Sequence, residues 1–444
     1  MVPADFARGK PRRFSLPGQW GAIEARYAGL GPSDPFSWLC DHLRDLGANA
    51  ALLEHEYLDR DYREEYRKFY AQTYRWVPDR CERLHFWKDQ QYLGYTSIRP
   101  IVGRPVGRTM IDPGAAFEQD LGCFIQASAT PYGRDFSVPA FPFISQDRQY
   151  GRCAHAVVWM IAHYHHLRNR TPERFMSDIV RAAAREETER VVPSPGLTDD
   201  QVGSAFHQLG LEAIRYEIGN DSLPEDMVLT VVTRFMNSGI PLALGTPGHL
   251  TAIIGAAYGE DGSLEVLQCD DEQGAYVRKP IELTGDDRWE VLFVPLPGRI
   301  YLGGEDVAPA ARAALKQLAQ ENDVDLRNRT LRYREYVVDV RDYKRRLFER
   351  QLPAEVAAAH AQVPSARWLW IVEVQDAELA RLSPRCVLGE IGVDATSDEH
   401  DLIHLFANLP GLRAVWRRDE VEPEVARFPI ESLEPYETGT SLNL

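Results

Sequence analysis

The chain has 444 residues and a formal net charge of −16. This length allows two or three domains with separate cores, and the negative charge argues against nucleic acid or an anionic membrane as the main partner. The first residues lack the apolar segment of a signal peptide, and no apolar run is long enough to span a bilayer. The six cysteines are scattered singly, without disulfide-like or metal-site spacing. We therefore expect a cytoplasmic protein with reduced thiols and no membrane partner.

The first region, residues 1–140, alternates predicted helices and strands. Residues 35–46 are expected to form a helix, and the acidic, Tyr-rich segment 54–74 is expected to form a solvated helix with i, i+4 charge pairs. Strands are predicted at residues 84–87, 92–98 and 101–111. The Pro- and Gly-rich segment 131–142 predicts a boundary loop before the next region. We assign this α/β region no role.

The second region, residues 141–300, has the clearest pattern. A turn-prone lead-in gives way at Cys153 to a long run of helix-forming and apolar residues, so a helix should begin at this cysteine. Further helices are predicted from the N-cap Thr171, from a capping box at Thr198, and over residues 224–237. Strands are predicted at residues 211–216, 240–244, 249–258, 263–269, 276–283 and 289–295. Helices precede an antiparallel sheet, which predicts an α+β architecture.

The third region, residues 301–444, is also expected to be α+β. Helices are predicted at residues 308–321, 340–350 and 398–409, the last because a capping box precedes it. Short strands are predicted at residues 368–374 and 389–393. We find no nucleophile–base pair in this region and expect it to serve packing or partner recognition.

Cys153 is the most informative residue of the chain. A cysteine at a helix N-terminus meets the positive end of the helix dipole, which favours the thiolate. His249 opens an apolar strand farther along, and the acidic pair Asp270 and Asp271 ends the following strand. Cysteine, histidine and acid in this order, on helix, strand and strand, form the layout of a thiol-based acyl-transfer site. His249 would be the base, and either acid could orient its ring.

Thiol catalysis also requires donors for the oxyanion that develops on the substrate. The backbone N–H of Cys153 would supply one donor, because it lies at the start of the helix. A side-chain amide upstream would supply the second, and both Gln146 and Gln149 are available.

Four histidines in the helix that starts at Cys153 invite a comparison with metal sites: His155, His163, His165 and His166. His163 and His166 share a helix face at i, i+3 spacing, but no second ligand cluster accompanies them. We therefore predict a solvated polar helix face here, with no metal and no cofactor.

The second region resembles the papain-like cysteine peptidases, in particular the bacterial branch that is similar to the bacteriocin-leader processing peptidases. The resemblance covers about residues 141–300 and rests on Gln146 ahead of Gly151-Arg152-Cys153-Ala154, on Gly196-Leu197-Thr198 to Leu209-Gly210-Leu211, on Ser238-Gly239-Ile240-Pro241-Leu242, on Gly248-His249 before Ala252-Ile253-Ile254-Gly255, and on Asp270. It implies a triad of Cys153, His249 and Asp270, with Gln146 in the oxyanion hole. The papain signature C-G-[SA]-C-[WY] is absent at Cys153.

The resemblance implies a thiol hydrolase, a peptidase or amidase that acts on a peptide or protein substrate without a cofactor. The same triad would also serve an acyl transferase of the transpeptidase or transglutaminase type, in which an amine or thiol resolves the thioester. A catalytically inactive papain-like scaffold would instead be a binding module. The sequence does not separate these functions, because pocket shape and water exclusion select the acceptor. The large flanking regions are expected to restrict access or to recognise a protein partner.

Overall fold

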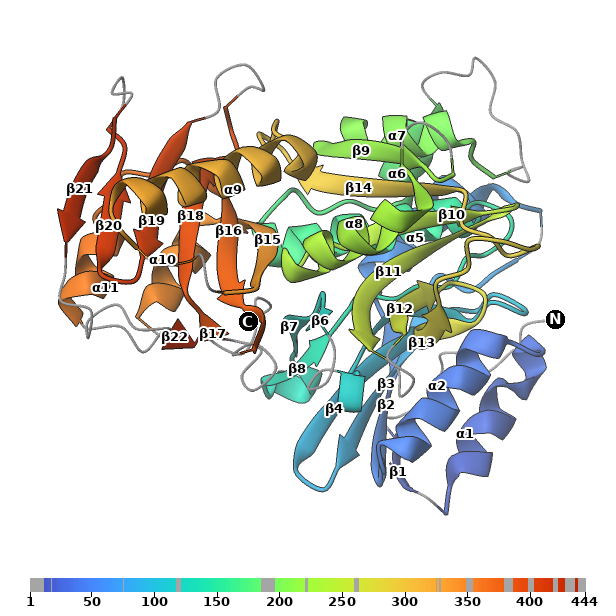
Figure 1. The fold of residues 1–444 in the computed structure, drawn as a ribbon. Helices are drawn as coiled ribbons and strands as arrows, with labels where there is room; N and C mark the ends of the chain where they lie inside the picture. The colour runs from blue at the N-terminus through green and yellow to red at the C-terminus, as the bar shows by residue number, and fades with distance from the viewer. Residues whose placement is uncertain are drawn as a thin grey trace. The chain divides into compact units, whose positions relative to one another are not determined.

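The computed structural model describes residues 12–16, 18–74, 76–116, 121–184, 196–219, 223–258, 263–324, 326, 329–348, 354–378, 386–397, 403–417, 422–427 and 436–437. By internal contacts the chain forms two compact units: unit 1 holds Met1–Val232 and Gly239–Pro297, and unit 2 holds Thr233–Ser238 and Gly298–Leu442. Each unit combines helices with antiparallel sheet (Figure 1), which is the predicted α+β class. The division into three regions stays a prediction, since residues 1–140 and most of 141–300 share unit 1.

Unit 1 begins with a five-stranded antiparallel sheet in the order β1-β2-β3-β4-β5. Its strands are β1 (Arg12–Ser15), β2 (Ala50–Tyr57), β3 (Cys81–Lys88), β4 (Gln91–Ile98) and β5 (Val106–Ile111). Helices α1 (Trp20–Tyr27) and α2 (Asp34–Asp45), joined by the short η1 (Ala28–Leu30), lie over this sheet (Figure 1). The buried side chains of Phe14, Leu43 and Phe86 belong to the core that they share. The helix predicted at residues 35–46 is thus confirmed.

The solvated helix predicted over residues 54–74 is confirmed only in its middle part, and it is less exposed than predicted. Residues 54–57 belong to β2, and only α3 (Arg60–Lys68) and the short η2 (Tyr70–Gln72) are helical. Two acids of α3, Asp61 and Glu65, are buried. Glu65 forms an ion pair with the equally buried Arg99, at a distance of 3.2 Å between the guanidinium nitrogen and the carboxylate oxygen. The sequence suggested local i, i+4 pairs, whereas the partner of Glu65 comes from the end of β4.

The predicted boundary loop at residues 131–142 is also wrong. Strands β7 (Ile125–Ala129) and β8 (Phe136–Ala140) form an antiparallel hairpin around the short η3 (Pro131–Gly133). Val138 and Ala140 are buried in a cluster with aromatic residues of β4. Proline is tolerated here because β8 pairs with only one neighbour in this two-stranded ladder, so the missing N–H removes no central hydrogen bond.

Four helices follow in unit 1: α5 (Cys153–Asn169), α6 (Met176–Ala183), α7 (Asp199–Gln208) and α8 (Glu225–Asn237), whose last residues belong to unit 2. Helix α5 begins at Cys153 as predicted. Helix α7 begins at the predicted capping box, where Thr198 accepts the N–H of Gln201. Helix α6 does not begin at Thr171 as predicted. The carbonyl of Thr171 lies 2.6 Å from the ring of His166, and the chain stays non-helical until α6 begins.

The histidines of α5 do not form the predicted solvated face. His155, His163 and His165 are buried, because nearly the whole circumference of α5 is covered. The His163 ring stacks on Trp159 with a centroid separation of 4.8 Å, and His165 contacts Asn169 at 2.7 Å. Burial lowers the pKa of His165 to about 3, so this ring stays neutral. These histidines are core residues of a central helix.

The second sheet of unit 1 is antiparallel, in the order β13-β12-β11-β10-β14-β9, with β6 paired to β11. Its strands are β6 (Leu121–Gly122), β9 (Leu211–Glu217), β10 (Leu242–Thr246), β11 (His249–Tyr258), β12 (Leu264–Asp270), β13 (Gly274–Pro280) and β14 (Val291–Pro297). Helix α5 packs against β11 (Figure 1). Because β11 and β12 are antiparallel neighbours, the first residue of β11 and the last residue of β12 lie at the same end of the strand pair.

Unit 2 is built on an antiparallel sheet in the order β15-β16-β18-β19-β20-β21. Its elements are α9 (Gly304–Glu321), β15 (Leu331–Asp339), α10 (Val340–Leu347), α11 (Ala354–Ala361), β16 (Trp368–Asp376), β17 (Cys386–Val387), β18 (Gly389–Asp394), β19 (His404–Leu409), β20 (Leu412–Val415), β21 (Glu424–Arg427) and β22 (Tyr436–Glu437). Tyr336, Leu369 and Phe406 lie in its core. Within the described ranges of both units, every helix is too short or too polar to cross a membrane.

The helix predicted at residues 398–409 is wrong. Residues 398–402 lie outside the described residues, and β19 then pairs with β18 and β20 in the middle of the sheet. The capping-box pattern that suggested a helix stands at a turn, where Asp394 accepts the N–H and the hydroxyl of Thr396. A local motif was outweighed here by strand pairing on both sides.

Candidate active site

The segment before Cys153 is folded around one carboxylate, that of Asp147. This carboxylate accepts the backbone N–H groups of residues 149–151 at 2.8–3.1 Å and the hydroxyl of Tyr70 at 2.5 Å. Several converging donors hold a short loop in one conformation, since each charge-assisted bond is stronger than a neutral one. The chain then enters α5 in an extended conformation at Arg152, and Cys153 is the first helical residue.

The Cys153 side chain is half-buried, in contrast to the fully buried Cys40, Cys81, Cys123 and Cys269. It lines a cavity of about 420 Å³ in unit 1. The described lining of this cavity comprises Gln146, Arg152, Cys153, Ala154, Gly196, Leu197, Asp199, Val202, Gly245, Thr246, Gly248, His249, Leu250, Glu272, Glu290 and Val291. The cavity places the sulfur within reach of a ligand and beside the histidine of β11.

His249 is positioned by the turn between β10 and β11. Gly248 in this turn has a φ of +74°, a left-handed conformation that favours glycine. The His249 ring has two neighbours at the site: its Nε2 is 3.1 Å from Oδ1 of Asp270, and the Cys153 side chain lies close enough to raise the pKa of the ring. Sulfur, imidazole and carboxylate therefore form a continuous chain of contacts.

This arrangement sets the charges of the histidine and of the acid that contacts it. Burial lowers the pKa of His249, but the hydrogen bond that its ring donates to Asp270 and its interaction with the Cys153 side chain outweigh burial and raise the pKa to about 10. Burial raises the pKa of Asp270, but the His249 contact, the N–H of Glu272 and the charge of Lys279 bring it below its usual value. An imidazolium facing an ionised Asp270 follows at neutral pH.

Asp270 and Asp271 occupy different environments, which distinguishes the two candidate acids. Asp270 contacts His249, whereas neither oxygen of Asp271 has a hydrogen-bond partner among the described residues. Burial raises the pKa of Asp271 to about 7. His249, Asp270 and Asp271 each offer a ligand atom within 4.8 Å, a grouping that can hold a cation. Lys279 lies 3.8 Å from one carboxylate oxygen of Asp270, and His249 contacts the other oxygen. We therefore interpret the group as a hydrogen-bonded histidine–carboxylate pair and not as a metal site.

Of the two candidate glutamines, Gln146 is buried and lines the cavity with Cys153, whereas Gln149 is exposed and does not line it. The Gln146 amide donates to Oε1 of Glu272 at 2.8 Å. Glu272 is held in turn by Arg104 at 3.1 Å and by Arg148 at 2.6 Å. An amide carries two N–H donors, so this bond fixes the side chain and leaves the second donor for another acceptor.

Sequence reasoning missed two residues that position this site, Asp147 and Glu272. Asp147 had a detectable signal, because an acid two residues before a turn commonly accepts the N–H groups that follow it. Glu272 had none, since its contacts with Gln146, Arg104 and Arg148 join segments far apart in the chain.

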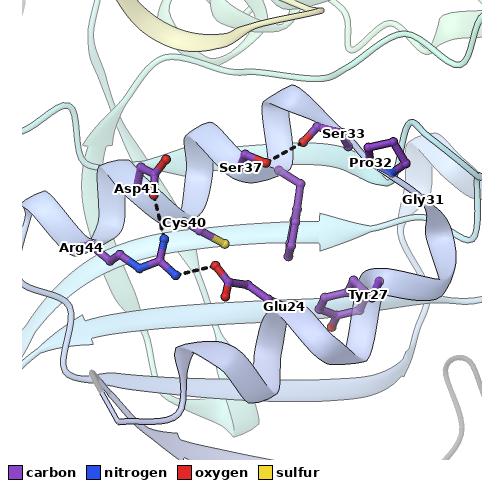
Figure 2. A pocket seen from close by; sticks show the side chains of 11 residues that line it. Glu24, Tyr27, Gly31, Pro32, Ser33, Ser37, Cys40, Asp41 and Arg44 are labelled. Carbon is purple, nitrogen blue, oxygen red and sulfur yellow. Dashed lines mark hydrogen bonds and ion pairs between the residues drawn. The ribbon is translucent and has the colours of Figure 1, made fainter.

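A second cavity of about 410 Å³ lies between α1 and α2 and contains another thiol, that of Cys40 (Figure 2). Burial raises the pKa of Cys40 to about 12, so the thiol stays protonated. Arg44 bridges Glu24 and Asp41 beside it. No histidine is among the described residues that line this cavity, and we assign the thiol no chemistry.

No family model matches the chain, and no curated protein matches it. Among solved structures, a chain in the crystal structure of UfSP from C. elegans is 16% identical, with a TM-score of 0.27. The match covers 35% of this chain and 33% of that chain, so it spans about a third of each. A likeness of this extent carries no argument about function.

Proposed function

We propose that the chain is a papain-like thiol hydrolase that cleaves an amide bond of a peptide or protein substrate through a thioester on Cys153. The observation that carries this proposal is the contact chain from Cys153 to His249 to Asp270, in which the sulfur starts α5 and lines a cavity. A nucleophile, a base and an orienting group in hydrogen-bond contact are what thiol catalysis requires. The singly placed free cysteines suit a reducing compartment such as the cytoplasm.

In the first half of the reaction His249 holds the proton taken from the Cys153 thiol, and the thiolate attacks the substrate carbonyl carbon. The carbonyl oxygen gains negative charge and accepts hydrogen bonds from the backbone N–H of Cys153 and from the free amide hydrogen of Gln146. His249 then gives its proton to the departing amine as the C–N bond breaks, which leaves the acyl group on sulfur. Asp270 keeps the ring in place through both proton transfers.

In the second half a water molecule enters where the amine has left. His249, now neutral, removes a proton from this water as it attacks the thioester carbonyl. The C–S bond breaks and the carboxylic acid departs. Cys153 is released as the thiolate, and His249 keeps the proton that it took from water. The enzyme is regenerated without a cofactor.

The proposal is tested by mass spectrometry after treatment with a thiol-directed peptidyl epoxide, using wild type, Cys153→Ala and His249→Ala. We expect one adduct on Cys153 in wild type, none in Cys153→Ala, and much slower labelling in His249→Ala. Cys386 is the internal control, because its side chain is also half-buried. Labelling of Cys386 as fast as Cys153 would refute the proposal. Peptide-library digestion by wild type, with products absent for Cys153→Ala, then tests hydrolysis itself.

A further inference from the structure

Asp271 is a carboxyl group that the proposed reaction does not use. It is fully buried, and neither of its oxygens has a hydrogen-bond partner among the residues that the structure describes. The backbone N–H of Gln146 is close enough to favour the carboxylate, but it does not reach hydrogen-bond geometry. A buried, unpartnered acid is unfavourable when ionised, so this position favours the neutral form of Asp271.

The position of Asp271 relates it directly to His249. One ligand atom from each of His249, Asp270 and Asp271 lies within 4.8 Å of the others. The charged groups around Asp271 are His249 on β11, its chain neighbours Asp270 and Glu272, Lys279 on β13 near Asp270, and Arg104 and Arg148, which pair with Glu272. Arg104 and Arg148 already pair with Glu272. His249 is therefore the cation on which we expect the charge of Asp271 to act.

We propose that Asp271 is a positioning residue for His249, a second carboxyl that is neutral when the site is active and, once ionised, holds the imidazolium proton too tightly for transfer. This inference rests on the proposed function of Cys153 and His249. The proton lost from the Asp271 carboxyl passes to solvent, and no bond other than O–H changes. The added negative charge lies within a few ångströms of the His249 ring, where an opposite charge strongly stabilises the protonated form.

We therefore expect activity to fall as the pH rises through the pKa of Asp271. This pH is well below the pKa of His249. His249 must give a proton to the departing amine, and a second carboxylate beside the ring opposes this step. Burial raises the pKa of Asp271 to about 7, which puts the change near neutral pH, whereas the pKa of His249 is raised to about 10. The site would therefore work best at neutral to mildly acidic pH.

The test follows the His249 ring by NMR in the full chain, with selectively labelled histidines and His249→Gln to identify the signal. Cys153→Ala is the background, so that the result does not depend on the nucleophile. We expect a step in the His249 signal near neutral pH in this background. Adding Asp271→Asn should remove the step and move the main titration of His249 down by about one pH unit or more.

Glu272→Gln is the matched control, because it removes a neighbouring carboxylate that Arg104 and Arg148 neutralise. The step should persist in this variant. A His249 titration unchanged by Asp271→Asn, or a step that disappears with Glu272→Gln, overturns the inference. If Asp271→Asn does not fold, Asp271→Ser carries the same expectation. Failure of the proposed function would be seen separately, as an unreactive Cys153 in the otherwise unaltered chain.

Discussion

Replacing Asp271 with asparagine removes a carboxyl whose pKa burial raises to about 7, from a usual value of 3.8. The stabilising effect of the bound proton is fully present below the pKa of the unfolded chain and is lost as pH rises through the pKa of the folded chain. Between these values each pH unit lowers the stability of wild type by about 1.4 kcal/mol. Asparagine resembles the neutral acid in shape and has no proton to lose. The advantage of Asp271→Asn should therefore grow by about 3 kcal/mol between pH 5 and pH 8.

Urea denaturation of both proteins at a series of pH values measures this difference. The free energy of unfolding of Asp271→Asn minus that of wild type should rise from about pH 4 to about pH 7 and then level off. Asp287→Asn is the control, because it makes the same substitution at an exposed position, and an equal rise in this variant would show that the effect does not come from the burial of Asp271. A difference that stays constant with pH would show that Asp271 ionises as an ordinary surface acid, and would refute the reasoning.

Two further changes, at Arg99 and at Asp147, test how buried charged groups stabilise unit 1 and the loop that precedes Cys153. Arg99→Met leaves the buried Glu65 without its partner and should lower the free energy of unfolding by about 3–5 kcal/mol in urea denaturation; a loss under about 1 kcal/mol would contradict the assigned role. Asp147→Ala removes the acceptor of three backbone N–H groups and should cost about 3 kcal/mol or more. It should also slow alkylation of Cys153, and unchanged stability and alkylation together would rule out this support.

The sequence predicted best the elements whose boundaries carry local signals. The helix that starts at Cys153 and the strand from His249 to Tyr258 were placed correctly, because a change from polar to apolar residues marks each start. The capping box at Thr198 likewise predicted the start of α7. The similar pattern near residue 398 failed, since the residues that follow are paired on both sides in a sheet and that pairing is not encoded locally.

The candidate site was predictable in its central residues but not in the groups that surround them. Cys153, His249 and Asp270 could be proposed from order and spacing, and the structure brings them into contact. The burial of Asp147 and Asp271 could not be foreseen, because acids are rarely fully buried and both depend on residues from distant segments. The choice between Asp270 and Asp271 needed the position of the His249 ring, which depends on strand register.

The central claim, that Cys153 is an activated nucleophile, is tested most directly by its rate of alkylation with iodoacetamide at pH 6, measured by mass spectrometry against Cys386 in the same chain. An ordinary thiol is less than about 1% thiolate at this pH, so a preformed thiolate should react about 10 to 100 times faster even though its nucleophilicity is reduced. The account predicts that Cys153 shows this advantage and that His249→Ala abolishes it. Equal rates for the two cysteines in wild type would contradict the account.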